Sequence, residues 1–228
     1  MPDPSASSPV FSLEHAAFAY PGGRTIFADL NLDLAPGRHL GLFGGNGEGK
    51  TTLFRLITGL EKLTSGRVLL HGEEMRTEKD FARLRRSVGL VLQQADDQLF
   101  CPTVLEDVSF GPLNLGLSPD EAREKACSAL RSLGLAGFED RLTHRLSGGE
   151  KKLVSLAGVL AMEPEAILFD EPTAALDERA VKRLAEVLAD LSQARIVVSH
   201  DRAFLESCSD ALLLLSGGTL TDLPAQEA

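Results

Sequence analysis

The sequence has few of the features that indicate export, membrane insertion or nucleic-acid binding. Its three cysteines, Cys101, Cys127 and Cys208, are widely spaced and form no CxxC motif. An odd count without an export signal suggests reduced, buried thiols in the cytosol. No apolar run approaches the ~20 residues that span a bilayer. Lysine and arginine number 23 against 33 acidic residues, and the formal net charge of −10 argues against a general nucleic-acid-binding surface.

The ends of the chain also lack recognisable signals. Residues 1–10 have neither the basic nor the apolar part of a secretory signal, and we expect a short disordered lead there. The chain ends soon after residue 200, so we expect no long C-terminal dimerisation domain. Apolar residues at 43% and charged residues at 25% are ordinary for a globular protein, and 228 residues suffice for one substantial core.

What the sequence does contain is a glycine-rich loop between an apolar strand-like run, 40–43, and an apolar helix-like segment. The pattern G-x-x-x-x-G-K-[ST] is met at 44–51. Glycines let backbone N–H groups surround phosphate oxygens at a helix N-terminus. Lys50 is then expected on the β- and γ-phosphates and the Thr51 hydroxyl on Mg²⁺. The alternative, a turn that binds nothing, fits this strand-loop-helix context poorly. The loop residues are Gly44, Gly45, Asn46, Gly47, Glu48, Gly49, Lys50, Thr51 and Thr52.

A second polar segment ends the apolar run at 166–169. Asp170, at the carboxyl end of a strand beside a phosphate loop, is placed to hold Mg²⁺ through its water shell. Glu171 can orient or deprotonate the water that attacks the γ-phosphorus. The alternative is that the two acids cap the following turn. The phosphate loop upstream favours the catalytic interpretation.

The segment 146–150, LSGGE, begins another helix. Ser147 and Glu150 form a capping box, which explains helix initiation without any ligand. The capping box does not explain Gly148 and Gly149 in the first turn, where each glycine costs about 1 kcal/mol of helix stability. Glycines are favourable there if the helix N-terminus approaches a phosphate closely. We therefore favour phosphate contact.

Strand-like and helix-like segments alternate on both sides of a helical stretch at 95–162, which contains capping boxes at Thr103 and Ser118. Continuous apolar strands predict an α/β fold with a mainly parallel sheet, whereas the alternation at 30–34 predicts a half-exposed antiparallel strand. We expect strands at 12–20, 30–34, 40–43, 67–71, 88–92, 166–169, 196–198 and 212–215, helices at 50–58, 81–86, 119–133, 147–162, 177–191 and 202–208, and a terminal hairpin turning at Gly217 and Gly218.

These motifs, in this order, resemble the ATP-binding cassette (ABC) ATPase family over nearly the whole chain. Residues 44–51 match the Walker A motif, 146–150 the LSGGQ signature and 166–171 the Walker B motif with its glutamate. Tyr20 matches the aromatic residue that stacks on adenine, Gln93 the Q-loop glutamine, 175–177 the D-loop and His200 the switch histidine. Each of these matches is weak alone, and their order carries the resemblance. It implies one ATPase domain at 1–228, with a RecA-like P-loop NTPase core and antiparallel β subdomain (1–94 and 163–228) and an inserted α-helical subdomain (95–162).

The resemblance also implies what the residues do. In this family two ATPase chains, identical or different, pair head to tail, and each ATP lies between the Walker motifs of one chain and the signature of the other. Ser147 and Gly149 would therefore contact the γ-phosphate of the partner's ATP. The implied cofactors are ATP and Mg²⁺. The implied catalytic residues are Lys50, Gln93, His200 and, as the base, Glu171. The implied Mg²⁺ ligands are Thr51, Gln93 and Asp170. Nucleotide binding by the glycine-rich loop is implied to be completed by Tyr20, Gly148, Glu150 and Asp177.

Segments 92–100 and 106–112 resemble the ATPase subunits of energy-coupling-factor importers, particularly the cobalt and nickel group. This resemblance implies a subunit at the cytoplasmic face of the cell membrane. Its partners would be an integral membrane coupling protein, which contacts the helical insertion, and a substrate-binding membrane subunit, without nucleic acid. Asp96 and Asp97 suit an arginine of the coupling protein, and a solvated acidic loop is the alternative.

Three other functions remain open. One is an importer for a vitamin or other micronutrient. A soluble mechanical ATPase acting on DNA or ribosomes is disfavoured by the acidic charge and the lack of basic arms. A switch without hydrolysis is disfavoured by Glu171 and His200.

Two departures from the family pattern stand out, since Glu150 replaces the usual glutamine and Leu153 a common arginine. No histidine has metal-ligand spacing, so we expect no transition-metal site on this chain.

Overall fold

The computed structural model describes residues 8–23 and 25–224. The chain divides into two compact units, one formed by Met1–Val88, Glu165–Asp170 and Ser192–Ala228 and the other by Gly89–Pro164 and Glu171–Leu191. The expected subdomain boundaries, after 94 and 162, stay a prediction.

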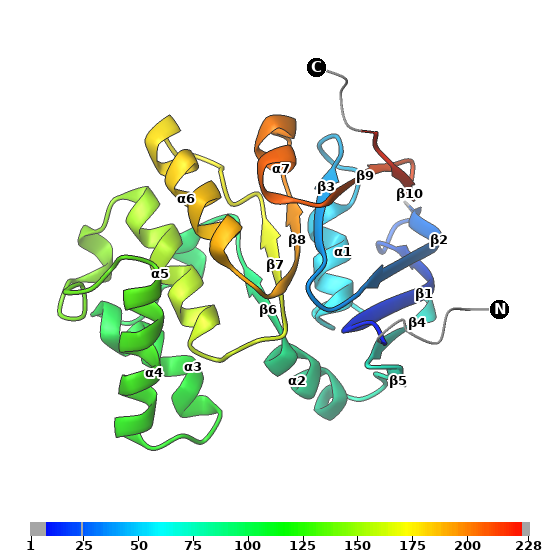
Figure 1. Ribbon diagram of the computed structural model, residues 1–228. Coiled ribbons are helices and arrows are strands. Elements are labelled where there is room, and N and C mark those ends of the chain that lie inside the picture. Colours follow the sequence, from blue (N-terminus) through cyan, green and yellow to red (C-terminus); the bar gives the residue numbers. More distant parts are fainter. Residues whose placement is uncertain (1–7, 24, 225–228) are drawn as a thin grey trace. The chain divides into compact units, whose positions relative to one another are not determined.

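The first unit contains a sheet that is mainly parallel, as predicted. β3 (His39–Phe43) pairs in parallel with β8 (Ala194–Val198) and β9 (Ala211–Ser216), and β8 pairs in parallel with β7 (Ala166–Asp170). β10 (Thr219–Asp222) forms the predicted hairpin with β9. Every residue of β7 and β8 is buried, which explains their continuous apolar sequences. α1 (Lys50–Ile57) contacts β7, and α7 (Arg202–Cys208) contacts β3 and β9 (Figure 1).

The same unit contains an antiparallel sheet in the order β2-β1-β4-β5. Its strands are β1 (Phe11–Ala19), β2 (Thr25–Leu34), β4 (Ser65–Leu70) and β5 (Glu73–Glu74). Leu30, Leu32 and Leu34 are buried while Asn31 and Asp33 are exposed, which confirms the half-exposed strand. β2 begins at Thr25, five residues before the predicted start at 30, since its first half is mostly exposed and lacks strict alternation.

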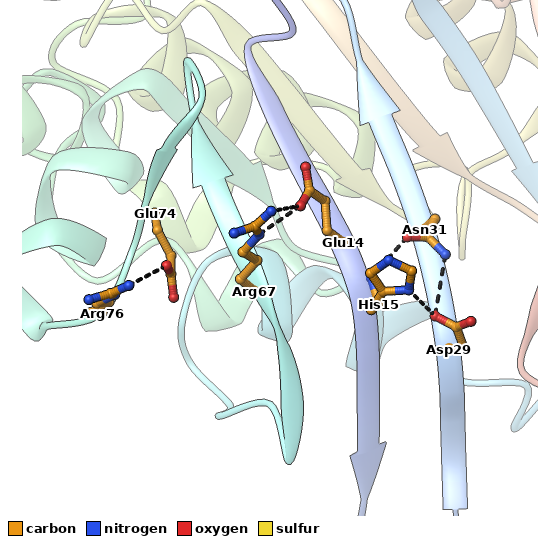
Figure 2. A network of polar contacts seen from close by, with 7 residues as sticks. All are labelled: Glu14, His15, Asp29, Asn31, Arg67, Glu74 and Arg76. Carbon is orange, nitrogen blue, oxygen red and sulfur yellow. Dashed lines mark hydrogen bonds and ion pairs between the residues drawn. The ribbon is translucent and has the colours of Figure 1, made fainter.

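The polar face of this sheet is organised around an irregularity in β1, shown in Figure 2. Glu14 accepts a hydrogen bond from Arg67 Nε of β4 at 2.6 Å, and the next residue, His15, contacts Asp29 of β2 with Nδ1 2.8 Å from Oδ1. His15 has a φ of 50°, and the pairing register shifts beside it. Such a bulge lets two consecutive residues point away from the core. Exposed pairs of this kind contribute about 0–1 kcal/mol each.

α2 (Glu78–Ser87) follows β5 and begins before the predicted start at 81. Thr77 and Asp80 close a capping box, with Asp80 Oδ2 2.9 Å from the Thr77 nitrogen. Two arginines of α2 form ion pairs at the surface, Arg83 with Glu73 and Arg85 with Glu78. β6 (Val88–Val91) then leads the chain into the second unit.

The second unit is built from helices. They are α3 (Val104–Asn114), α4 (Pro119–Ser132), α5 (Gly148–Leu160) and α6 (Glu178–Asp190), with short 3-10 turns η1 (Ala95–Asp97) and η2 (Thr143–Arg145). α3, α4 and α5 pack on one another, and α6 packs on α5 (Figure 1). The capping boxes predicted at Thr103, Ser118 and Ser147 are all closed. These boxes explain why the predicted helix starts at 119 and 147 agree with those of α4 and α5 to within one residue.

The structure corrects in part the expected disordered lead at residues 1–10 and the expected burial of the three cysteine thiols. Residues 1–7 of the expected disordered lead lie outside the described residues, but Val10 is buried and its N–H donates to Leu34 O at 2.7 Å, so the expectation is wrong there. Of the three free cysteines only Cys208 is buried, while Cys101 and Cys127 are half-buried. Within the part of the chain that the structure describes, no helix is both long and apolar enough to cross a membrane.

The cap of α2 gives a direct test of this local structure. Thr77→Ala removes the hydroxyl that accepts from the Asp80 N–H, and we expect the free energy of unfolding to fall by about 1 kcal/mol. Urea denaturation measures this change. Lys79→Ala, an exposed substitution in the first turn of the same helix, is the control and should stay within about 0.5 kcal/mol of wild type. Equal losses in the two variants would contradict the role of the cap.

Candidate functional site

The residues predicted to form the site belong to both units. The first unit holds Tyr20, 44–52, Asp170 and His200, and the second holds Gln93, 146–150, Glu171 and Asp177.

The phosphate loop connects β3 to α1 and ends at a residue that must be glycine. Gly49 is the N-cap of α1 with a φ of 100°. A Cβ on it would lie 2.5 Å from Ile26 Cγ2 and 2.9 Å from Phe27 Cζ, both on β2. Positive φ and lack of space both exclude other side chains here. The loop thus leads directly into a helix N-terminus, where N–H groups and the helix dipole favour a phosphate.

Lys50 occupies the interior of this loop. Its ammonium donates to Gly44 O at 2.7 Å and to Gly45 O at 3.0 Å, and the residue is only 7% exposed. A buried cation held by two backbone carbonyls of the loop is suited to the charge of a triphosphate. Thr51 is exposed on the first turn of α1, and Asp170 ends β7, the strand that α1 contacts. These are the hard oxygen ligands that Mg²⁺ takes, with phosphates and water completing its shell.

Two contacts from other parts of the first unit support the loop. The Gly217 N–H, in the turn between β9 and β10, donates to Glu48 Oε2 at 2.8 Å, so the Glu48 side chain turns toward this hairpin. Tyr20 has its hydroxyl oxygen 2.8 Å from Thr52 Oγ1, and its ring stands edge-on to Phe18 at 4.9 Å between centroids. The aromatic residue predicted to stack on adenine is therefore fixed to the helix that follows the loop.

In the second unit, the LSGGE segment forms the exposed N-terminus of α5. Ser147 N–H donates to Glu150 Oε2 at 2.8 Å, closing the predicted capping box. A Cβ on Gly149 would come within 3.0 Å of Ala180 Cβ on α6, whereas the nearest atom to Gly148 would be 3.9 Å away. Packing inside the unit therefore explains Gly149. Gly148 is exposed and has room for a side chain, so packing inside the unit does not explain this glycine.

The acidic departure at Glu150 is balanced within the chain. Arg141 Nη1 lies 3.2 Å from Glu150 Oε1, and its guanidinium lies 3.5 Å from the centre of the Phe138 ring. The backbone hydrogen bond from Ser147, assisted by Arg141, lowers the pKa of Glu150. Glu150 therefore stays ionised, and an arginine offsets its charge. The sequence offered no signal for this pair, because Arg141 belongs to an irregular segment.

Leu153, the other departure, lines a cavity of about 410 Å³ between the beginning of α5 and α6. Arg179 and Arg183 of α6 also line this cavity, so cations border this space even though α5 carries a leucine. Asp177 caps α6 by accepting from the Ala180 N–H at 2.8 Å. The D-loop aspartate and the signature helix thus border one cavity in the second unit.

The remaining predicted catalytic residues differ in their exposure to solvent. Glu171 is buried and has a φ of 44°, a strained conformation of the kind that gathers at functional sites. Gln93 and His200 are exposed, each just after a strand, β6 and β8 respectively. Among the residues described, no three His, Cys, Asp or Glu side chains gather as metal ligands.

A glycine loop around a buried lysine, at the junction of a parallel strand and a helix, defines a nucleoside-triphosphate-binding P-loop protein. Comparison with known proteins identifies the family. The model of the ABC transporter family matches residues 27–174, and the chain belongs to this family. Its fold is that of the ABC ATPase cassettes, and it is an ATPase, as the motifs indicated.

Individual relatives agree with this assignment. The chain is 45% identical to the cobalt import ATP-binding protein CbiO of Rhodobacter capsulatus, over 92% of this chain and 77% of that protein. It superposes with a TM-score of 0.86 and 35% identity on cbiO1 of Clostridium perfringens, described as part of the ABC transporter complex cbiONQ, covering 94% of this chain and 87% of that one. The dimeric structure of the ATP-binding cassette MJ0796 bound to ADP and Pi superposes with a TM-score of 0.82 at 26% sequence identity. The superposition covers 96% of this chain and 100% of that one.

The lowered pKa of Glu150 predicts a pH-dependent stability. A carboxyl whose pKa is depressed by folding stabilises the protein above its unfolded pKa, and this contribution is lost as pH falls through the folded value. Glu150→Gln should therefore be less stable than wild type at pH 7, and the difference should shrink below pH 4.5, the usual value for this group. Urea denaturation of both proteins at a series of pH values from pH 7 to below pH 4.5 measures this difference in unfolding free energy. Arg141→Gln should reproduce only part of the effect, and a pH-independent difference would contradict the explanation.

Proposed function

We propose that this chain is the ATP-hydrolysing subunit of an energy-coupling-factor type importer for cobalt or nickel ions, working at the cytoplasmic face of the cell membrane. Its similarity to a cobalt import protein and to a component of the cbiONQ complex supports the proposal, as does the resemblance of 92–100 and 106–112 to that group. Selectivity for the ion would reside in the membrane subunits, so this chain supplies the driving force.

The observation that carries the mechanism is the exposed N-terminus of α5. The first N–H groups of a helix have no partner within it, and Ser147 and Gly148 are exposed there. We propose that this turn binds the γ-phosphate of an ATP held by the phosphate loop of a second ABC chain, identical or different. Because both chains would share the charge of that phosphate, its presence couples ATP binding to head-to-tail closure and its loss to opening.

Within each composite site the residues would divide the work. Lys50 would bind the β- and γ-phosphates, with Thr51, Asp170 and Gln93 around Mg²⁺, which offsets phosphate charge. Glu171 would take the proton of the attacking water, and His200 would hold the γ-phosphate. Tyr20 would stack on adenine, and Asp177 and Glu150 would border the nucleotide from the signature side.

The helical unit carries a surface suited to the membrane partner. Phe100 and Phe110 are 64% and 43% exposed and stand edge-on at 4.7 Å, beside Leu113 at 44%. Asp107 on α3 accepts from the Phe100 N–H at 2.8 Å and so fixes this aromatic segment to the helix. We propose that Phe100, Phe110 and Leu113 receive an apolar helix of the coupling protein. Asp96 is already paired with Lys151 at 2.6 Å, so exposed Asp97 is the better partner for an arginine.

Steady-state Mg-ATPase assays test the catalytic part. Glu171→Gln should lower kcat by about 100-fold or more while ATP still binds, since a general base contributes 10²–10⁴-fold. Lys50→Ala should lose ATP binding itself. If Glu171→Gln turns over as fast as wild type, Glu171 is not the base. If the wild-type protein binds ATP without turnover, alone and with its membrane partners, the chain acts as a nucleotide-dependent switch instead.

The membrane partner is tested by co-purification from detergent-solubilised membranes. Phe100→Ser combined with Phe110→Ser should reduce the coupling protein recovered on tagged chain by at least about 10-fold, since buried aromatic residues dominate interfaces. Leu60→Ser, at a residue that is 60% exposed in the first unit, is the matched control. Loss in the control alone would place the interface elsewhere. Absence of any membrane protein, with ribosomes or DNA recovered instead, would favour a soluble mechanical ATPase.

A further inference from the structure

A buried lysine in the signature helix holds the backbone of the Q-loop. Lys152, in the second turn of α5, is only 3% exposed. Its ammonium donates to Leu92 O at 2.9 Å and to Gln93 O at 2.7 Å. Burying an ammonium is costly unless it is hydrogen-bonded, so these two carbonyls are tied to the helix. The Gln93 side chain itself remains exposed.

A second side chain ties the same segment to the same helix. Gln98 Oε1 accepts from the Leu92 N–H at 3.1 Å, while its Nε2 lies 3.4 Å from both Leu90 O and Ser155 O. At the surface, Lys151 pairs with Asp96. The segment after β6 is therefore fastened along the first two turns of α5, and Lys152 is the buried member of this set.

We infer that Lys152 is a positioning residue for hydrolysis, because it couples the signature turn to Gln93. This inference rests on the site roles proposed above. Lys152 lies three residues after Gly149, about 4.5 Å along one rigid helix. A shift of α5 on engaging a γ-phosphate would carry the Gln93 backbone with it. Gln93 would then reach its catalytic position only when the signature is engaged, which ties hydrolysis to closure.

A positioning role for Lys152 differs measurably from a role in stabilising the fold alone. If Lys152 acts through Gln93, removing both should cost no more turnover than removing Gln93 alone. A purely structural residue would instead lower turnover independently of Gln93, so that the losses of the two single variants multiply in the double variant. The phosphate loop belongs to the first unit, so ATP binding should be insensitive to Lys152.

The experiment is a double-mutant cycle on kcat in the full-length chain, combining Lys152→Met with Gln93→Ala. We expect Lys152→Met to lower kcat by about 10-fold or more, because misplacement by about 1 Å can cost 100-fold. The KM for ATP should stay within about 2-fold, and Lys152→Arg should recover part of the loss. Lys151→Met, which removes only the surface pair with Asp96, is the control and should retain wild-type kcat. The double variant should match Gln93→Ala.

Hydrogen exchange provides a readout that does not depend on turnover. Amides at 92–98 should exchange faster in Lys152→Met, while those of α3 at 104–114 should not change. If Lys152→Met does not fold, Lys152→Gln, which keeps a donor, replaces it in the cycle.

Three results would overturn the inference. They are wild-type kcat in Lys152→Met, multiplicative losses in the double variant, and equal acceleration of exchange in α3. A Gln93→Ala chain with wild-type kcat would overturn the proposed role of Gln93 and this inference with it. Loss in Gln93→Ala with full turnover in Lys152→Met would overturn the inference alone.

Discussion

The contact between the Lys50 ammonium and the carbonyl oxygens of Gly44 and Gly45 is the interaction on which the first unit depends. It keeps a buried cation inside the phosphate loop. The rest of the unit supports that loop from outside: β2 packs against Gly49, and the β9–β10 turn donates to Glu48. A triphosphate needs such a cation together with the helix N-terminus behind it. Strand β2 and the β9–β10 hairpin therefore both contact the glycine-rich phosphate loop.

The second unit presents a helix N-terminus of another kind. At α5 the turn is exposed and capped by Ser147, and the charge of Glu150 is met by Arg141. In this way the chain carries a glutamate, where its family usually has glutamine, without leaving an uncompensated charge beside the proposed phosphate site. Gly149 is held by packing on Ala180, which leaves Gly148 and the exposed Ser147 as the features that point outward. The two helix N-termini are complementary parts of the proposed two-chain site.

Local patterns in the sequence predicted much of this structure. Continuous apolar strands indicated β7 and β8, strict alternation indicated the second half of β2, and capping boxes placed α3, α4 and α5, because each signal lies within a few residues. The early start of α2 was missed although Thr77 and Asp80 lie three residues apart, since the box uses aspartate in place of glutamate. The pairs that shape the site, Lys152 with Gln93, Arg141 with Glu150 and Glu48 with Gly217, could not be predicted. They join segments that only the tertiary fold brings together.

Sedimentation velocity can show whether the signature turn acts on ATP held by another chain. Sedimentation velocity of Glu171→Gln with Mg-ATP, with and without the additional change Ser147→Arg, is compared with ATP binding to the same proteins. The account predicts that Glu171→Gln dimerises on adding ATP, while the Ser147→Arg version binds ATP equally well and stays monomeric. An ATP-dependent dimer that survives Ser147→Arg, or a loss of ATP binding to the monomer, would contradict the two-chain site.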